Sequence, residues 1–216
     1  MKILIAIFVA ALMGAATVFG HEPGEDASTE GLFSLKAEYV HTLLNPIPVY
    51  GLALGALSLA LALLARNKTA QVISLILIVL CSAAAWPVLY YGQHGYNHLF
   101  PQLDTESQQW LDVHMHRAEQ FICAFYATAI LGIAGLFCFR KFPSAAKALS
   151  IVTLLASLAS LGIGGWISRA GGQVSHSEFR EEGATPPSTA QHDAHEHGGE
   201  KMQTTNTSGG HQHEDK

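Results

Sequence analysis

The stretch Leu52–Leu80, LALGALSLALALLARNKTAQVISLILIVL, decides the fold. It holds two apolar runs on either side of a short basic link, Arg66-Asn67-Lys68, and neither run carries a charged residue. Followed outward to the next polar residues, each run has about 20 residues, the length of an α-helix that crosses the hydrocarbon core of a bilayer. The sequence therefore predicts transmembrane helices over 43–65 and 70–91.

Two further apolar runs predict spans over 118–139 and 147–168. The whole chain of 216 residues is 49% hydrophobic and 13% charged, whereas a typical soluble domain is about 25% charged. Short links make neighbouring helices antiparallel, so the predicted fold is all-α, an up-down four-helix transmembrane bundle in a lipid bilayer. The net charge of −5 and the lack of a basic stripe make nucleic acid an unexpected partner.

The charges of the links predict the orientation. Both short links, 66–68 and 140–144, are basic, and the positive-inside rule places them in the cytoplasm. The middle link, 92–113, and both termini are then expected in the periplasm of a bacterium, with the protein in its inner membrane. At the N-terminus, one lysine followed by an apolar run predicts a signal peptide over 1–20, cleaved before His21. The alternative is an uncleaved anchor helix.

The remaining segments have simpler expectations. Residues 21–36 form a short periplasmic segment, 37–179 the bundle domain, and 180–216 a polar tail rich in Gly, Ser, Thr and Gln that is expected to be disordered. Short histidine-rich tracts bind metal ions. The candidate metal ligands of the tail are His192, His195, His197, His211 and His213.

All twelve histidines fall on the predicted outer side, and each of the four spans carries at least one at its outer end. Four helices that each contribute a side chain can build a cofactor or metal site in a bundle. The alternative is a set of solvated interface residues. The candidate ligands near the bundle are His41, His94, His98, His114, His116 and His176, together with Glu38 and Glu119.

Spacing refines this set. Glu38-x-x-His41 and His116-x-x-Glu119 each place two side chains on one helix face, which resembles the ligand pattern of di-iron bundles without their two further glutamates. His114 and His116 cannot both face inward from one regular helix. With Glu119 as a support for His116, we expect His116 inward and His114 outward. The alternative for Glu119 is a pair with Arg117 or a place at the membrane interface.

Two chemistries suit these imidazoles. Histidines on diagonal helices can hold a b-type haem, and the natural pairs are His41 with His116 (or His114) and His94 with His176. Copper or zinc also favours imidazole. The leading expectation is haem-b electron transfer with a quinone or a periplasmic redox or metal-carrier protein. The alternative is copper or zinc handling, or an accessory role in assembly. No motif of covalent catalysis occurs, so an enzyme is not expected.

Four short motifs carry a family resemblance over 37–179. They are Asn45-Pro46-Ile47-Pro48, Tyr91-Gly92-Gln93-His94-Gly95, His116-Arg117-Ala118-Glu119 and Gly171-Gly172-Gln173-Val174-Ser175-His176. With them the chain resembles a bacterial four-span membrane protein family of uncharacterised function, DUF2231-like, and in outline the small haem-b bundles. The resemblance implies the same architecture. The pattern departs from the two-haem type, which has histidines at both membrane faces.

Overall fold

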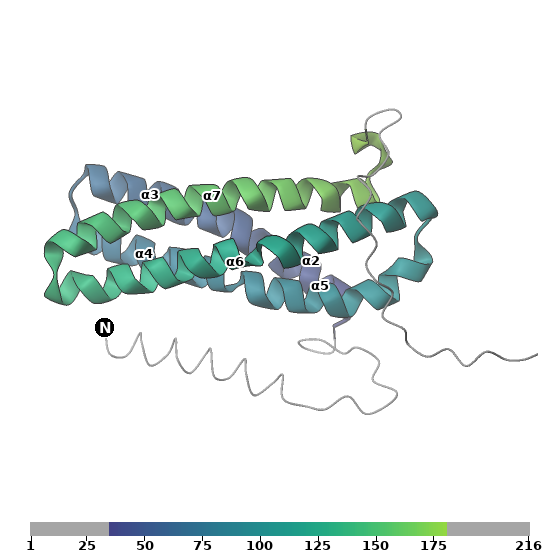
Figure 1. The fold of residues 1–216 in the computed structure, drawn as a ribbon, viewed down its shortest axis with the longest axis horizontal. Coiled ribbons are helices and arrows are strands. Elements are labelled where there is room, and N and C mark those ends of the chain that lie inside the picture. Colours follow the sequence, from purple (N-terminus) through teal and green to yellow (C-terminus); the bar gives the residue numbers. More distant parts are fainter. Residues whose placement is uncertain (1–34, 181–216) are drawn as a thin grey trace, which may run out of the picture. The chain divides into compact units, whose positions relative to one another are not determined.

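Four long helices, packed side by side, make up the part of the chain that the structure describes (Figure 1). The structure is a computed structural model that describes residues 35–180. The predicted signal peptide, most of the segment 21–36 and the tail beyond Arg180 lie outside this range. All four helices are long and apolar enough to cross a membrane, which confirms, for the described residues, the prediction of an all-α fold with four helices of spanning length.

The first helix is interrupted by its prolines. It consists of α2 (Ala37–Leu44), a π-helical turn (Ile47–Gly51) and α3 (Leu52–Leu64). The helix begins six residues before the predicted span start at residue 43, and Pro46 and Pro48 lie inside it. A proline has no N–H to donate within a helix, and the wider π turn accommodates that loss.

The second helix shows the expected effect of Pro87. It divides into α4 (Lys68–Ala83) and α5 (Ala85–Leu99), with the break at Ala84. Asn67 caps its start by accepting a hydrogen bond from the Ala70 amide at 3.1 Å. Pro87 cannot donate to the carbonyl four residues earlier, so the regular ladder is interrupted in the turn before it.

The third and fourth helices are longer than their apolar runs. They are α6 (Thr105–Lys141) and α7 (Pro143–Ser175), followed by a 3-10 turn at Ser177–Phe179. A helix of 37 residues is about 55 Å long, well beyond a hydrocarbon core of about 30 Å. Part of α6 therefore continues as a polar helix outside the membrane core.

The predicted middle link over 92–113 is largely helical. Helix α5 continues to Leu99, a 3-10 turn covers Phe100–Gln102, and α6 already begins at Thr105. Helix α6 can begin at Thr105 because the Asp104 carboxylate caps it, accepting hydrogen bonds from the amides of Glu106 and Ser107. The link is thus a tight turn between two extended helices.

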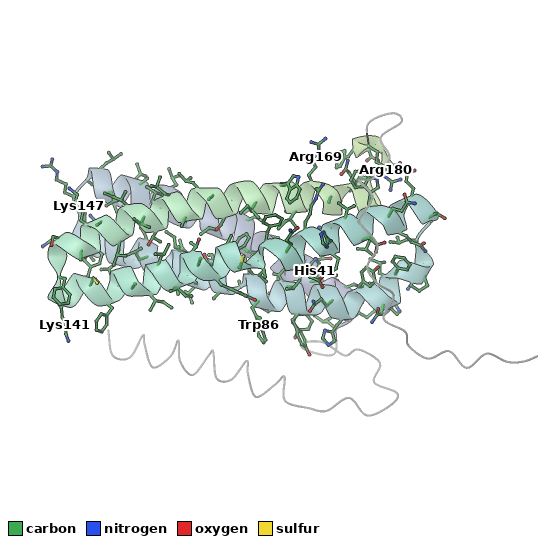
Figure 2. The ribbon with its side chains drawn as sticks, in the orientation of Figure 1. His41, Trp86, Lys141, Lys147, Arg169 and Arg180 are labelled. Atoms are coloured by element: carbon green, nitrogen blue, oxygen red, sulfur yellow. The ribbon has the colours of Figure 1, made fainter. Side chains whose placement is uncertain are left out.

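Consecutive helices are antiparallel neighbours, and α7 also packs on α3, which closes the bundle. The first and third helices are diagonal, as are the second and fourth. We call the end with the turn at Phe100–Asp104 the histidine end and the other, with Lys141 and Lys147 in Figure 2, the basic end. Close approach at the basic half uses Gly55, where an added Cβ would lie 2.9 Å from Ile78.

Candidate functional site

Two histidines from diagonal helices meet inside the bundle. His41 comes from α2 and His114 from α6, and their ring centroids are 6.2 Å apart with the ring planes at 81°. Figure 2 shows His41 in the half of the bundle that lies toward Arg180. The pair is therefore inside the helices but close to the histidine end.

Each ring is fixed by one hydrogen bond to the backbone of a neighbouring helix. His41 Nδ1 lies 2.8 Å from the carbonyl oxygen of Val88 on α5, and His114 Nδ1 lies 3.0 Å from that of Ile167 on α7. A carbonyl oxygen can only accept, so Nδ1 carries the proton in both rings. In the neutral form Nε2 is then unprotonated, which is the state in which imidazole binds a metal ion.

Each ring also rests against a glycine four residues beyond its carbonyl partner. A Cβ added to Gly92 would lie 3.0 Å from His41 Nδ1, and one added to Gly171 would lie 3.1 Å from His114 Nδ1. Only glycine leaves this space open against the helix backbone. The first and second helices and the third and fourth helices thus repeat one arrangement of histidine, carbonyl and glycine.

Both rings line a cavity that runs along the bundle axis. On α5 its lining extends from Ala85 to Leu99, about 21 Å at 1.5 Å per residue. Apolar groups form most of the wall, and the cavity is partly open with a volume of about 150 Å³. An apolar pocket with a few placed polar groups is typical of a ligand site.

Glu38 and Tyr96 are two further polar residues in the cavity lining. Glu38 lies one helical turn before His41, and Glu38 Oε1 pairs with His98 Nδ1 at 3.1 Å. The other carboxylate oxygen, Oε2, is buried and has no hydrogen-bond partner among the described residues. Tyr96, also in the lining, donates its hydroxyl to the carboxylate of Asp112.

The structure reverses the expected roles of the two histidines on the third helix. His114 is part-buried and lines the cavity, whereas His116 and Glu119 are exposed. The prediction that His116 faces inward was therefore wrong, although the two histidines do face apart as expected. The Glu119 carboxylate accepts a hydrogen bond from Gln93 Nε2 on α5 at 2.8 Å.

The other predicted ligands lie outside the cavity lining. His94 is exposed and donates to the carbonyl of Tyr90, on whose ring it lies at a centroid distance of 4.1 Å. His176 is exposed and pairs with Glu178 at 2.9 Å. Within residues 35–180 no three His, Cys, Asp or Glu side chains are grouped to hold a metal ion. The predicted metal cluster is thus not assembled in this part of the chain, and the five tail histidines lie outside it.

Comparisons of the chain with protein-family models, curated proteins and solved structures find no match. A function for the chain is therefore inferred from the geometry of the two histidines and their cavity.

Sequence reasoning missed the groups that hold the two rings. The carbonyls of Val88 and Ile167 are backbone atoms and leave no trace in a sequence. A local signal does exist at the histidines, because each follows a valine, and both Val40 and Val113 are almost fully buried. The repeated Val-His pair could have selected His114 over His116.

Proposed function

We propose that the chain is a multi-pass membrane protein that binds b-type haem between His41 and His114 and takes part in electron transfer. The supporting observation is the 6.2 Å separation of two imidazoles whose Nδ1 atoms are both bonded to backbone carbonyls. With metal–nitrogen bonds of about 2.0 Å, the centres of two imidazoles on opposite sides of one metal ion lie roughly 6 Å apart. His41 and His114 could therefore hold one metal ion between them.

The number of protein ligands favours haem over a bare metal ion. Structural zinc takes four protein ligands and catalytic zinc takes three, whereas residues 35–180 hold no group of three. A haem brings its own four nitrogens and needs only axial ligands from the protein. Two imidazoles are therefore enough protein ligands for haem and too few for zinc.

The cavity is elongated in the direction that such a cofactor requires, but its volume is smaller than the cofactor requires. A ring system between two diagonal imidazoles lies parallel to the helices, and the cavity is elongated in that direction. Its volume of about 150 Å³ is below the roughly 300–1,000 Å³ of most cofactor pockets, so side chains must move on binding. Met115 lines the cavity, and the unbranched methionine side chain adapts readily to new neighbours.

The protein groups would orient and tune the cofactor, and bound haem would supply one-electron chemistry. The Val88 and Ile167 carbonyls hold each ring in one tautomer and raise its basicity as a ligand. The basic links favour a bacterial inner membrane with the histidine end in the periplasm. At that depth the site could exchange electrons with a quinone or with a periplasmic carrier protein.

The absorption spectrum tests this proposal. The full chain, purified after expression with haem supplied, should show a Soret band, and His41→Ala and His114→Ala should each lose or shift it. The exposed His94→Ala and His116→Ala are matched controls and should keep the wild-type band. A wild-type chain without a Soret band, or an unchanged band in both His41→Ala and His114→Ala, would refute haem ligation by this pair.

A second candidate function is copper or zinc handling, and the five histidines between His192 and His213 favour it. Short tracts of this kind bind metal ions. Truncation after Arg180 should lower the copper and zinc bound per chain in elemental analysis and leave the helical circular dichroism unchanged. Equal metal content in both chains would remove this candidate.

A further inference from the structure

An arginine of α6 stacks on a tryptophan of α7 at the surface of the bundle. The guanidinium carbon of Arg117 lies 4.0 Å from the centre of the Trp166 ring, and Arg117 Nη1 donates to the Trp166 carbonyl at 3.1 Å. The Trp166 ring is itself held edge-to-face by Phe121, at a centroid distance of 5.5 Å. A guanidinium has five N–H donors. This arrangement therefore fixes the group and leaves other donors for a further partner.

A second arginine adds positive charge at the same place. Arg169 is exposed on α7 and points away from the bundle (Figure 2), and it lies close enough to Arg117 for the two charges to repel. Among the described residues Arg117 forms no ion pair, and Glu119, the nearest carboxylate along α6, accepts from a residue of α5 instead. An anion beside both guanidinium groups would offset their repulsion. Phosphate suits them, because its oxygens match the planar fork of arginine.

Both arginines border an apolar run of their helix. The run of α6 begins at Ala118, next to Arg117, and the run of α7 ends at Ser168, next to Arg169. In a bilayer these positions lie at the level of the headgroups, where tryptophan is also enriched. The phosphate present at that level belongs to a phospholipid.

The surface of α7 below the arginines has room for an acyl chain. Gly162 and Gly165 are exposed, and a Cβ added to either would meet nothing within 4 Å among the described residues. At about 3.6 residues per turn, both lie on the face of α7 that carries Arg169, and exposed Leu158 continues this face toward the basic end. Small residues allow close packing in the membrane. A lipid whose phosphate meets the arginines can therefore lay one acyl chain on this face.

We propose that Arg117 and Arg169 hold the phosphate of an anionic glycerophospholipid, with an acyl chain against Gly162 and Gly165. Two positive charges favour a lipid of net negative charge over a zwitterionic one, which presents an ammonium group beside its phosphate. Trp166 is a positioning residue, because it fixes the Arg117 guanidinium by stacking. The proposal rests on the membrane location in the proposed function and is independent of haem binding.

Quenching of tryptophan fluorescence by brominated lipids tests the proposal. The full chain is reconstituted in phosphatidylcholine vesicles with a small fraction of brominated phosphatidylglycerol or, in the matched arm, of phosphatidylcholine brominated at the same acyl positions. Subtracting the signal of Trp166→Phe isolates the quenching of Trp166. Phosphatidylglycerol should reach half-maximal quenching at a mole fraction at least about fivefold lower, the factor that corresponds to about 1 kcal/mol for one basic residue near an anionic surface.

Three variants locate the contact. Arg169→Gln removes the exposed charge and Arg117→Gln the stacked one, and each should remove most of the preference for phosphatidylglycerol. Lys147→Gln is the matched control, since it removes an exposed charge from the basic end of the same helix, and it should leave the preference unchanged. Equal quenching by both lipids in the wild-type chain, an unchanged preference in both arginine variants, or an equal loss in Lys147→Gln would overturn the proposal.

A competition arm separates a lipid from a soluble anion. Inorganic phosphate, added at constant ionic strength, should leave the preference unchanged, and a loss of the preference would overturn the assignment of a lipid. Quenching by neither lipid would contradict the membrane location itself, whereas equal quenching by both would refute the lipid site alone. The Soret band reports on the haem site separately, so the failure of each proposal is distinguishable from that of the other.

Discussion

Replacing Gly92 by alanine should weaken cofactor binding without unfolding the protein. The added Cβ would lie 3.0 Å from His41 Nδ1 and 3.1 Å from its Cε1, closer than ordinary van der Waals contact of about 3.5–4.0 Å. The ring must therefore move by roughly half an ångström, and its 2.8 Å hydrogen bond to Val88 is strained or lost.

The two effects on stability nearly cancel. Loss of one hydrogen bond costs about 0.5–1.5 kcal/mol, and removing a glycine from a helix interior contributes about 0.5–1 kcal/mol in the opposite direction. The free energy of unfolding of Gly92→Ala should thus stay within about 1 kcal/mol of the wild-type value. Binding is affected more, because losing the partner that orients a metal-ligating histidine typically costs about 10–100-fold in affinity.

Titration of the purified apoprotein with haem, followed at the Soret band, measures this effect. Gly171→Ala should behave as Gly92→Ala does, because its Cβ would meet the His114 ring at 3.1 Å. Gly162→Ala is the matched control on the same helix as Gly171, since its Cβ would meet nothing within 4 Å among the described residues. Wild-type affinity in both site variants, or an equal loss in Gly162→Ala, would refute the reasoning.

Two further predictions concern the closure of the histidine end. Arg180 donates to the carbonyls of Gln173 and Val174 at the end of α7 and to the Ser107 hydroxyl on α6, so Arg180→Ala should weaken hydrogen-exchange protection of the last turn of α7 by roughly 1–3 kcal/mol; unchanged protection would show that these bonds contribute nothing. At the start of α6, hydrogen bonds from the Ser107 hydroxyl and amide lower the pKa of Asp104. A depressed folded-state pKa means that the cap stabilises fully above the ordinary carboxyl pKa and is lost as pH falls through the lowered value. Protection factors of the amides in the first turn of α6, corrected for the intrinsic exchange rate at each pH, should therefore fall at acid pH in the wild-type chain, and Asp104→Asn, which caps without titrating, should not show the fall.

The number of spans was predictable because an uncharged apolar run of about 20 residues matches the thickness of a bilayer core and little else. The helix ends were not, since hydropathy detects only the part of a helix that faces lipid. Helix α6 shows the difference: its apolar run begins near Ala118, and the helix begins at Thr105. Asp104 and Ser107 carry the missing signal, because an aspartate followed three residues later by serine suits a helix start. The capping residues, more than the hydropathy, mark this boundary.

The sequence predicted which helix ends carry the histidines of the site, but it did not select the correct pair among them. His41 with His114 was among the expected diagonal pairs, but the preferred partner was His116. That preference relied on Glu119, which is exposed and accepts a hydrogen bond from Gln93. The rotation of α6 is set by what it buries, and Trp110, Val113 and Phe125 are all almost fully buried. A helical period drawn through those apolar residues turns His114 inward.

The repeated arrangement of histidine, carbonyl and glycine has a consequence for assembly. Each antiparallel pair of helices, the first with the second and the third with the fourth, supplies one imidazole, the carbonyl that holds it and the glycine on which it rests. Each pair therefore provides one of the two ligands. Neither pair can hold a cofactor between two imidazoles alone. Retention of the cofactor would then report that both pairs have inserted and docked in register, and a chain that had completed only its first two helices would remain colourless.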